Sequence, residues 1–135
     1  MKRFAFFLFL FSACKNRDAA VLLSYYSEES GKRAEWLAGH NTDDSAFIDY
    51  FRRETADIIL LSKDTENPEA SVFRASRLFD STCARYAIPR SDFTDIAPGM
   101  SDEETELQLR ENELGFLNRI VMLRSGKEGF IFTAH

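Results

Sequence analysis

Apolar residues recur at intervals of three and four along most of this chain, and that spacing constrains its fold more than any other feature. The clearest case lies in residues 42–63, where one stripe is formed by Phe47, Ile48, Phe51, Thr55, Ile58 and Ile59. Such spacing places the residues on one face of an α-helix. Because Leu60 and Leu61 widen that face, the sequence predicts a central helix over this range.

Two further helices are predicted on either side of this central one. The first covers residues 18–38, with a break or kink near Gly31, because glycine costs about 1 kcal/mol in a helix interior. The other covers residues 68–88 and begins with a proline behind the N-cap residue Asn67. It must stop before Pro89, which disfavours a helical residue in front of it. Its expected inward face comprises Val72, Ser76, Phe79, Cys83 and Tyr86.

A fourth helix begins at a capping box, Ser101-Asp-Glu-Glu104, and ends at Ser125-Gly126. Its apolar stripes comprise Leu107, Leu109, Leu114, Phe116, Leu117, Ile120, Val121 and Leu123. The same periodicity places three acidic residues on the opposite, solvated face, namely Glu103, Glu106 and Glu113.

Four amphipathic helices joined by short loops most simply form a bundle. We therefore expect an all-α fold, an up-down four-helix bundle over residues 18–126. One long connection, Ile88 to Met100, joins the third helix to the fourth. Residues 127–135 are expected to form a short extended C-terminal tail. Because an isolated strand has no sheet to join, an α/β fold is disfavoured.

The N-terminus has the layout of a secretory signal. Lys2 and Arg3 supply positive charge ahead of an unbroken apolar run from Phe4 to Phe11. The run is too short to span a bilayer, which takes about 20 residues. The sequence therefore indicates an exported chain.

The apolar run ends in Phe11-Ser12-Ala13-Cys14, which resembles the lipobox of bacterial lipoproteins. That family usually has leucine where Phe11 stands. The resemblance covers only residues 1–14 and implies a signal peptide over 1–13, with lipid attached to Cys14. Residues 14–17 would then be a lipidated N-terminus and short tether. The alternative is an ordinary signal, or a buried N-terminal segment, in which Cys14 is incidental.

A lipid anchor has consequences for location and for the cysteines. Acyl chains contribute about 0.8 kcal/mol per buried methylene, so the chain would stay at the cell membrane or outer membrane. Its domain would then lie in the periplasm or at the cell surface. An acylated Cys14 leaves Cys83 as the only thiol, whereas an unacylated one allows a Cys14–Cys83 disulfide. The net charge of −5 disfavours nucleic-acid binding.

No motif in the sequence predicts a cofactor, a metal site or catalytic residues. The chain lacks the Glu-x-x-His pairs of di-iron bundles and the Cys-x-x-Cys-His of covalent haem sites. Its two histidines, His40 and His135, fall at a helix end and at the C-terminus. Cys83 lies on an apolar stripe and is expected to be an inert thiol. We therefore expect a protein that is not an enzyme.

Two apolar segments are candidates for binding a partner. One is the long connection, with Phe93, Ile96 and Met100, and the other is the tail, with Phe130 and Phe132. Loops and strand-like tails can mark partner sites, although packing on the protein's own core is the alternative for both. Several arginines form either a patch for an acidic partner or lipid headgroup, or salt bridges to the fourth helix: Arg52, Arg53, Arg74, Arg77 and Arg85.

Together these features predict a small membrane-anchored envelope lipoprotein that acts as a non-catalytic binding or assembly module. Its partners would be the membrane, through the N-terminal lipid, and an envelope protein. In architecture alone it resembles pilotins and accessory lipoproteins, and a structural or immunity-type lipoprotein is equally compatible. The alternative is a cell-wall or envelope hydrolase using carboxylates of the loop and fourth helix, namely Asp92, Asp95, Glu103 and Glu104.

Overall fold

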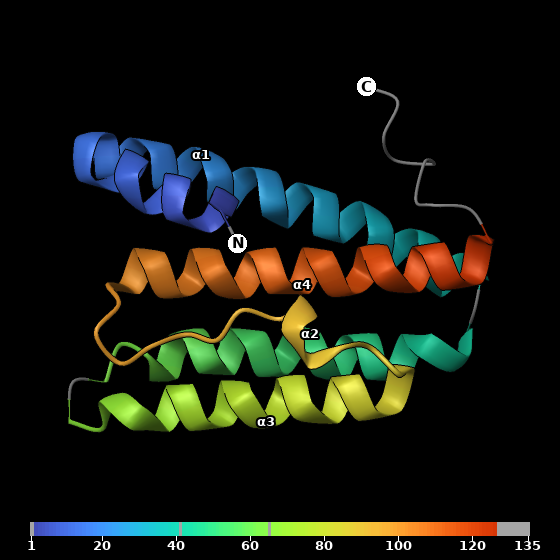
Figure 1. Cartoon of the computed structure of the whole chain (residues 1–135). Helices are drawn as coiled ribbons and strands as arrows, with labels where there is room; N and C mark the ends of the chain where they lie inside the picture. The colour runs from blue at the N-terminus through green and yellow to red at the C-terminus, as the bar shows by residue number, and fades with distance from the viewer. Residues whose placement is uncertain (1, 41, 65, 127–135) are drawn as a thin grey trace.

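The computed structural model describes the backbone of residues 2–40, 42–64 and 66–126, and the side chains of residues 18–40, 43–64 and 66–126. These residues form helices and no strand. The elements are α1 (Lys2–His40), α2 (Thr42–Leu61), α3 (Pro68–Tyr86), the 3₁₀ turn η1 (Arg90–Asp92) and α4 (Asp102–Ser125). The predicted all-α fold with four helices is confirmed (Figure 1).

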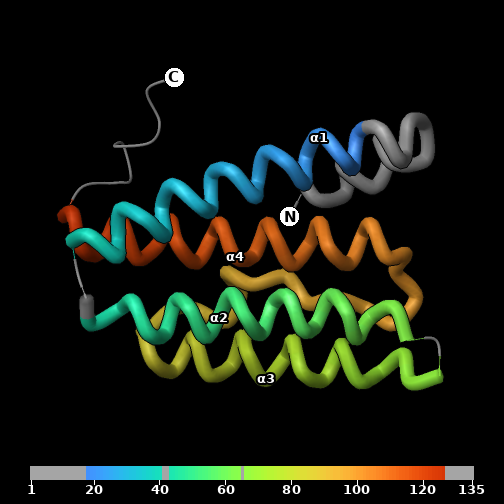
Figure 2. The backbone as a smooth tube through the Cα atoms, turned by 180° about the vertical axis from the view of Figure 1, so that it is seen from behind, coloured from blue at the N-terminus to red at the C-terminus, as the bar shows by residue number. Residues whose placement is uncertain are grey.

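The four helices lie in layers, with α4 between α1 on one side and the α2–α3 pair on the other (Figures 1 and 2). The long connection runs back along the bundle between α3 and α4 and contacts both through η1. As a result α3 and α4 run in the same direction, so the predicted up-down order holds for the first three helices and is wrong for α4. The connection is long enough to run back along the bundle, because an extended chain advances about 3.3 Å per residue, against about 1.5 Å in a helix.

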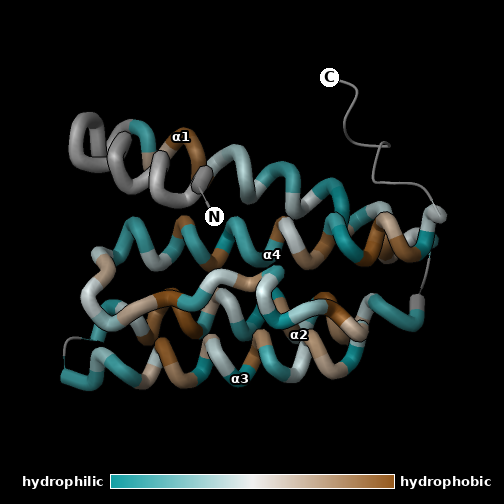
Figure 3. The backbone as a smooth tube through the Cα atoms, in the orientation of Figure 1, coloured by the Kyte–Doolittle hydropathy of each residue, from teal (hydrophilic) through white to brown (hydrophobic). Residues whose placement is uncertain are grey.

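The main core lies between α2, α3, α4 and this connection, and the C-terminal end of α1 contributes Leu37 to it. It is rich in aromatic rings: Phe79 stacks on Phe93 with ring centroids 4.7 Å apart, and Phe51 stacks on Phe116 at 4.6 Å. Apolar positions recur along α2, α3 and the connection (Figure 3). A smaller cluster joins α1 to α4 and comprises Ala19, Tyr26, Leu107 and Leu114.

Several predicted helix signals are present in the structure. The Ser101 hydroxyl accepts a hydrogen bond from the Glu104 N–H, and the Glu104 side chain accepts one from the Ser101 N–H, which completes the capping box. Gly126 adopts a left-handed conformation at the end of α4. Asn67 occupies the N-cap position of α3, but its side chain makes no capping hydrogen bond.

Two local expectations differ from the structure. Helix α1 begins at Lys2, well before the predicted start at residue 18, and it continues through Gly31 without the expected break. The buried face of α3 is rotated relative to the predicted stripe and comprises Ser71, Ala75, Leu78, Phe79 and Thr82. The reason is that small residues on α3 allow close approach to α2, whereas the larger Val72 and Tyr86 pack at the edge of the core.

Candidate functional site

A groove runs along the outer surface between α2 and α3, and we name it the α2–α3 groove. Its volume is about 780 Å³. It is lined by Tyr50, Glu54, Leu61, Ala70, Phe73, Arg74, Arg77, Leu78, Asp80 and Ser81. Both helices are amphipathic and bury one face in the core, so the groove is formed by residues at the border between their buried and exposed faces.

Large apolar side chains surround the α2–α3 groove. Phe73 is 64% exposed and Tyr50 is 37% exposed, and both line it. Leu60, which is 68% exposed, precedes the groove residue Leu61. Single exposed apolar residues are common on proteins, but a cluster around one concave surface is a feature of interaction sites.

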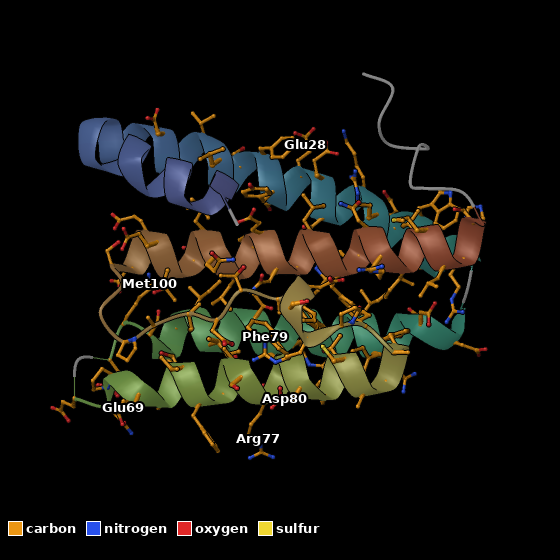
Figure 4. All side chains as sticks on the ribbon, viewed as in Figure 1. Glu28, Glu69, Arg77, Phe79, Asp80 and Met100 are labelled. Carbon is orange, nitrogen blue, oxygen red and sulfur yellow. The ribbon has the colours of Figure 1, made fainter. Side chains whose placement is uncertain are left out.

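Arg77 provides the groove with a positive charge. Its guanidinium carbon lies 5.8 Å from the centre of the Phe73 ring, in a cation–π contact. Figure 4 shows that Arg77 points away from the bundle, whereas Phe79 points inward. Within the described part of the chain, no salt bridge is formed by Arg77. Aromatic residues and arginine are enriched in the parts of interfaces that dominate binding energy.

The base of the groove is held by an arginine clamp between the two helices. Arg74 on α3 donates two hydrogen bonds of 2.9 Å to the Glu54 carboxylate and one of 3.1 Å to Asp57, both on α2. The hydrogen bonds from Arg74 lower the pKa of the Glu54 carboxyl despite its partial burial. This bidentate geometry links the two helices along the groove.

A second groove lies between α4 and the long connection, and we name it the α4 groove. Its volume is about 430 Å³, and its polar lining includes Ser91, Asp92, Thr94, Gln108, Glu111, Asn112, Asn118 and Arg119. The Asn112 side chain donates to the Thr94 carbonyl at 2.8 Å and accepts from the Thr94 N–H at 3.1 Å. This pair of hydrogen bonds attaches the connection to α4.

The four carboxylates considered for hydrolysis lie at different places. Asp92 pairs with Arg119 in the second half of α4, and Asp95 pairs with Arg90 at 2.7 Å. Glu103 and Glu104 belong to the first turn of α4, and Glu104 closes the capping box. Because α4 rises about 1.5 Å per residue, more than 20 Å separates its first turn from Arg119. Asp92 lines the α4 groove and none of the other three does.

The prediction that Glu113 lies on a solvated face is wrong. Glu113 is only 1% exposed, at the place where α1, α2 and α4 meet. Its carboxylate lies 3.2 Å from Arg52 of α2 and 3.4 Å from Arg110. Burial raises the pKa of the Glu113 carboxyl, and the two arginines oppose that rise. Helical periodicity did not predict the burial of Glu113, because α4 packs against neighbouring helices on two opposite sides and therefore has no fully solvated face.

Beside Glu113, the contact between α1 and α4 is polar. Arg33 of α1 pairs with Glu29 at 2.7 Å and donates to the side chain of Asn118 on α4. The hydrogen bond from Arg33 is the main cause that lowers the pKa of the Glu29 carboxyl. The buried Ser30 hydroxyl helps to lower the pKa of Glu113, although no hydrogen bond of normal geometry joins the two.

The arginines singled out in the sequence take several roles. Arg52 forms the expected salt bridge to α4, whereas Arg74 pairs within the α2–α3 layer instead. Arg85 lies 4.9 Å from the ring centre of Phe47, in a second cation–π contact. Arg77 is thus the member of this set that combines exposure with a place in the α2–α3 groove.

The apolar residues of the long connection belong to the core. Phe93 and Ile96 are buried, and Met100 packs against the same cluster. They therefore take the role of core packing, which was the alternative to binding a partner. Phe130 and Phe132 lie outside the described residues, as does the side chain of Cys14. Cys83 is half-buried, and burial raises the pKa of its thiol, which supports an inert role.

Comparison with known proteins identifies no family: no family model, curated protein or solved structure matches this chain. Among the described residues, no helix is both long enough and apolar enough to cross a membrane. The same residues contain no group of three or more histidine, cysteine or acidic side chains arranged to hold a metal ion.

Proposed function

We propose that this chain is a small lipid-anchored envelope protein that acts as a non-catalytic binding or assembly module, and that the α2–α3 groove is its partner surface. The observation that carries the proposal is the α2–α3 groove with exposed Phe73 and Tyr50 and the outward Arg77. The N-terminal signal and Cys14 supply the location.

The composition of the groove indicates the chemistry of the partner. The apolar rim suits a helix of another envelope protein that presents an apolar side chain to Phe73. The positive charge of Arg77, which is not neutralised by a salt bridge within the described residues, suits an acidic side chain beside it. We therefore expect an amphipathic helix with an acidic residue next to its apolar face.

Site-specific photo-crosslinking in the native cell tests the partner surface. A photoreactive phenylalanine analogue at Phe73 is expected to give one main adduct with an envelope protein, and Arg77→Glu is expected to reduce its yield at least tenfold. The matched control places the analogue at Leu123, which is 55% exposed and lies outside the groove. An adduct that is unchanged by Arg77→Glu, or equal at Leu123, would contradict the proposed surface.

The anchor is tested separately. Intact mass of the protein extracted from its own membranes is expected to show a chain that starts at Cys14 and carries acyl groups. Cys14→Ser is expected to release the protein from the membrane while leaving its helical content unchanged. Full membrane residence of that variant would refute the anchor and leave the α2–α3 groove untouched as a binding surface.

A further inference from the structure

The α4 groove has an unsatisfied hydrogen-bond acceptor in its wall. Gln108 is only 1% exposed, and its amide nitrogen donates to Asn112 Oδ1 at 3.3 Å. The two bonds to the Thr94 backbone fix the orientation of the Asn112 amide, and this in turn fixes the orientation of Gln108. The Gln108 carbonyl oxygen is left without a donor among the described residues. Buried acceptors are usually paired, and an occupant of the groove would supply this one with a donor.

The same wall has a notch at Gly115. A Cβ atom added there meets no other atom within 4 Å, and the residue lies two turns beyond Gln108 on the helix. Glycine in a helix interior is unfavourable, so its use in the middle of α4 is explained if an occupant approaches the backbone. The base of the groove beside it includes apolar Ile88, Phe116 and Met122.

We infer that the C-terminal tail of this same chain, residues 127–135, runs back along α4 and occupies the α4 groove. The tail starts at the right place, because Gly126 directly precedes it and donates a hydrogen bond to the carbonyl of Met122, which lines the groove. The left-handed conformation of Gly126, with φ of 70°, turns the chain out of the helical path.

The length of the tail matches the length of the groove. An extended chain advances about 3.3 Å per residue, and α4 about 1.5 Å, so two helical residues are passed for each tail residue. Counted back from Gly126, Phe130 and Phe132 come level with the turns on either side of Gly115. The last tail residues come level with Gln108, where a backbone N–H meets the free carbonyl oxygen.

The sequence of the tail suits this place. In GFIFT, Phe130 and Phe132 alternate with Ile131 and Thr133, so an extended tail presents both rings to one side. The two rings then lie against Gly115 and the apolar base of the groove, and the tail backbone lies against the amide side chains of Gln108 and Asn112. This inference rests on the α4 groove alone and does not depend on the proposed partner surface between α2 and α3.

Nuclear magnetic resonance on the full chain carrying Cys14→Ser, which avoids acylation, tests the inference. We expect nuclear Overhauser contacts between the rings of Phe130 and Phe132 and the methyl group of Met122. We also expect the double substitution Phe130→Ser and Phe132→Ser to shift the Gly115 amide and the Gln108 side-chain amide. The matched control is Leu123→Ser, an exposed residue of α4 outside the groove, which should leave both resonances in place.

Three outcomes would overturn the inference. In the first, the rings show no contact with the groove and water alone hydrates Gln108. In the second, the rings contact another surface of the bundle. In the third, the contacts weaken on dilution, which means that the tail of a second copy fills the groove. Photo-crosslinking from position 132 within the same chain, mapped to residues 108–122, supplies an independent measurement that does not depend on spectral assignment.

Discussion

The bundle has two contrasting halves: an aromatic core among α2, α3, α4 and the long connection, and a polar contact between α1 and α4. In the core, Phe79 and Phe93 stack with their ring planes only 7° apart. In the polar contact, Arg33 and Glu29 form a buried ion pair within α1, and the buried Glu113 of α4 pairs with Arg52 of α2. Stabilisation by burial of apolar area is non-directional and insensitive to pH. Removing one partner of a buried ion pair instead leaves an unpaired buried charge, which is destabilising. The halves should therefore respond differently to mutation and to pH.

The largest expected effect is in the aromatic core. Phe93→Ala removes a ring that packs against both Phe79 and Phe51 and should lower the free energy of unfolding by about 3–5 kcal/mol. Urea denaturation followed by circular dichroism measures this. The matched control is Phe73→Ala on exposed α3 surface, with an expected change below about 0.5 kcal/mol. Equal effects of the two substitutions would show that the connection does not complete the core.

A smaller loss is expected in the polar contact. Arg33→Ala breaks the pair with Glu29 and the hydrogen bond to Asn118, and it should cost about 1–3 kcal/mol at neutral pH. Its neighbour Lys32, whose side chain is 44% exposed, is the control, since Lys32→Ala should change the free energy of unfolding by less than about 0.5 kcal/mol. Hydrogen exchange should show faster exchange in α1 than in α3 for the Arg33 variant. Uniform acceleration across all helices would mean that the two halves unfold as one unit.

The pH dependence should separate two acids in the polar contact. The pKa of Glu29 is lowered from 4.5, so its stabilisation is present above pH 4.5 and is lost as the pH falls through the folded-state value. The pKa of Glu113 is raised from 4.5, so its stabilisation is present below pH 4.5 and is lost as the pH rises through the folded-state value. Unfolding titrations of Glu29→Gln and Glu113→Gln measure the two contributions. The loss of stability caused by Glu29→Gln should shrink in acid, whereas the loss caused by Glu113→Gln should shrink as the pH rises above 4.5. If the free energy of unfolding of the two variants varied with pH in parallel, the opposite pKa shifts would be contradicted.

The smallest expected effect is a gain at the border of the aromatic core. Ala87 ends α3 with φ of 56°, a left-handed conformation that is unfavourable for a residue with a Cβ. Ala87→Gly should therefore raise the free energy of unfolding by about 1 kcal/mol or less. Thermal unfolding is the measurement, and Ala84→Gly within the same helix should have the opposite sign. A loss at both positions would indicate that the left-handed turn is not under strain.

Short-range patterns made the helices and their ends predictable. The capping box at Ser101, Pro68 at the start of α3 and Gly126 at the end of α4 were all identified from neighbouring residues, because each cap involves only local hydrogen bonds. The α2–α3 groove was not predicted. The sequence does not distinguish the exposed Leu60, Tyr50 and Phe73 from apolar residues of the core. Helical periodicity shows which residues share a face of a helix, but it does not show which face is turned toward the core.

By itself the sequence determined an all-α chain and the approximate bounds of α2, α3 and α4, and it carries a lipobox-like N-terminus. Only the tertiary structure decided that Glu113 is buried against Arg52, that Phe93 completes the core, and that α4 runs parallel to α3. The physical reason is range: a helix and its caps are set by residues within about one turn, whereas burial depends on contacts between residues far apart in the chain.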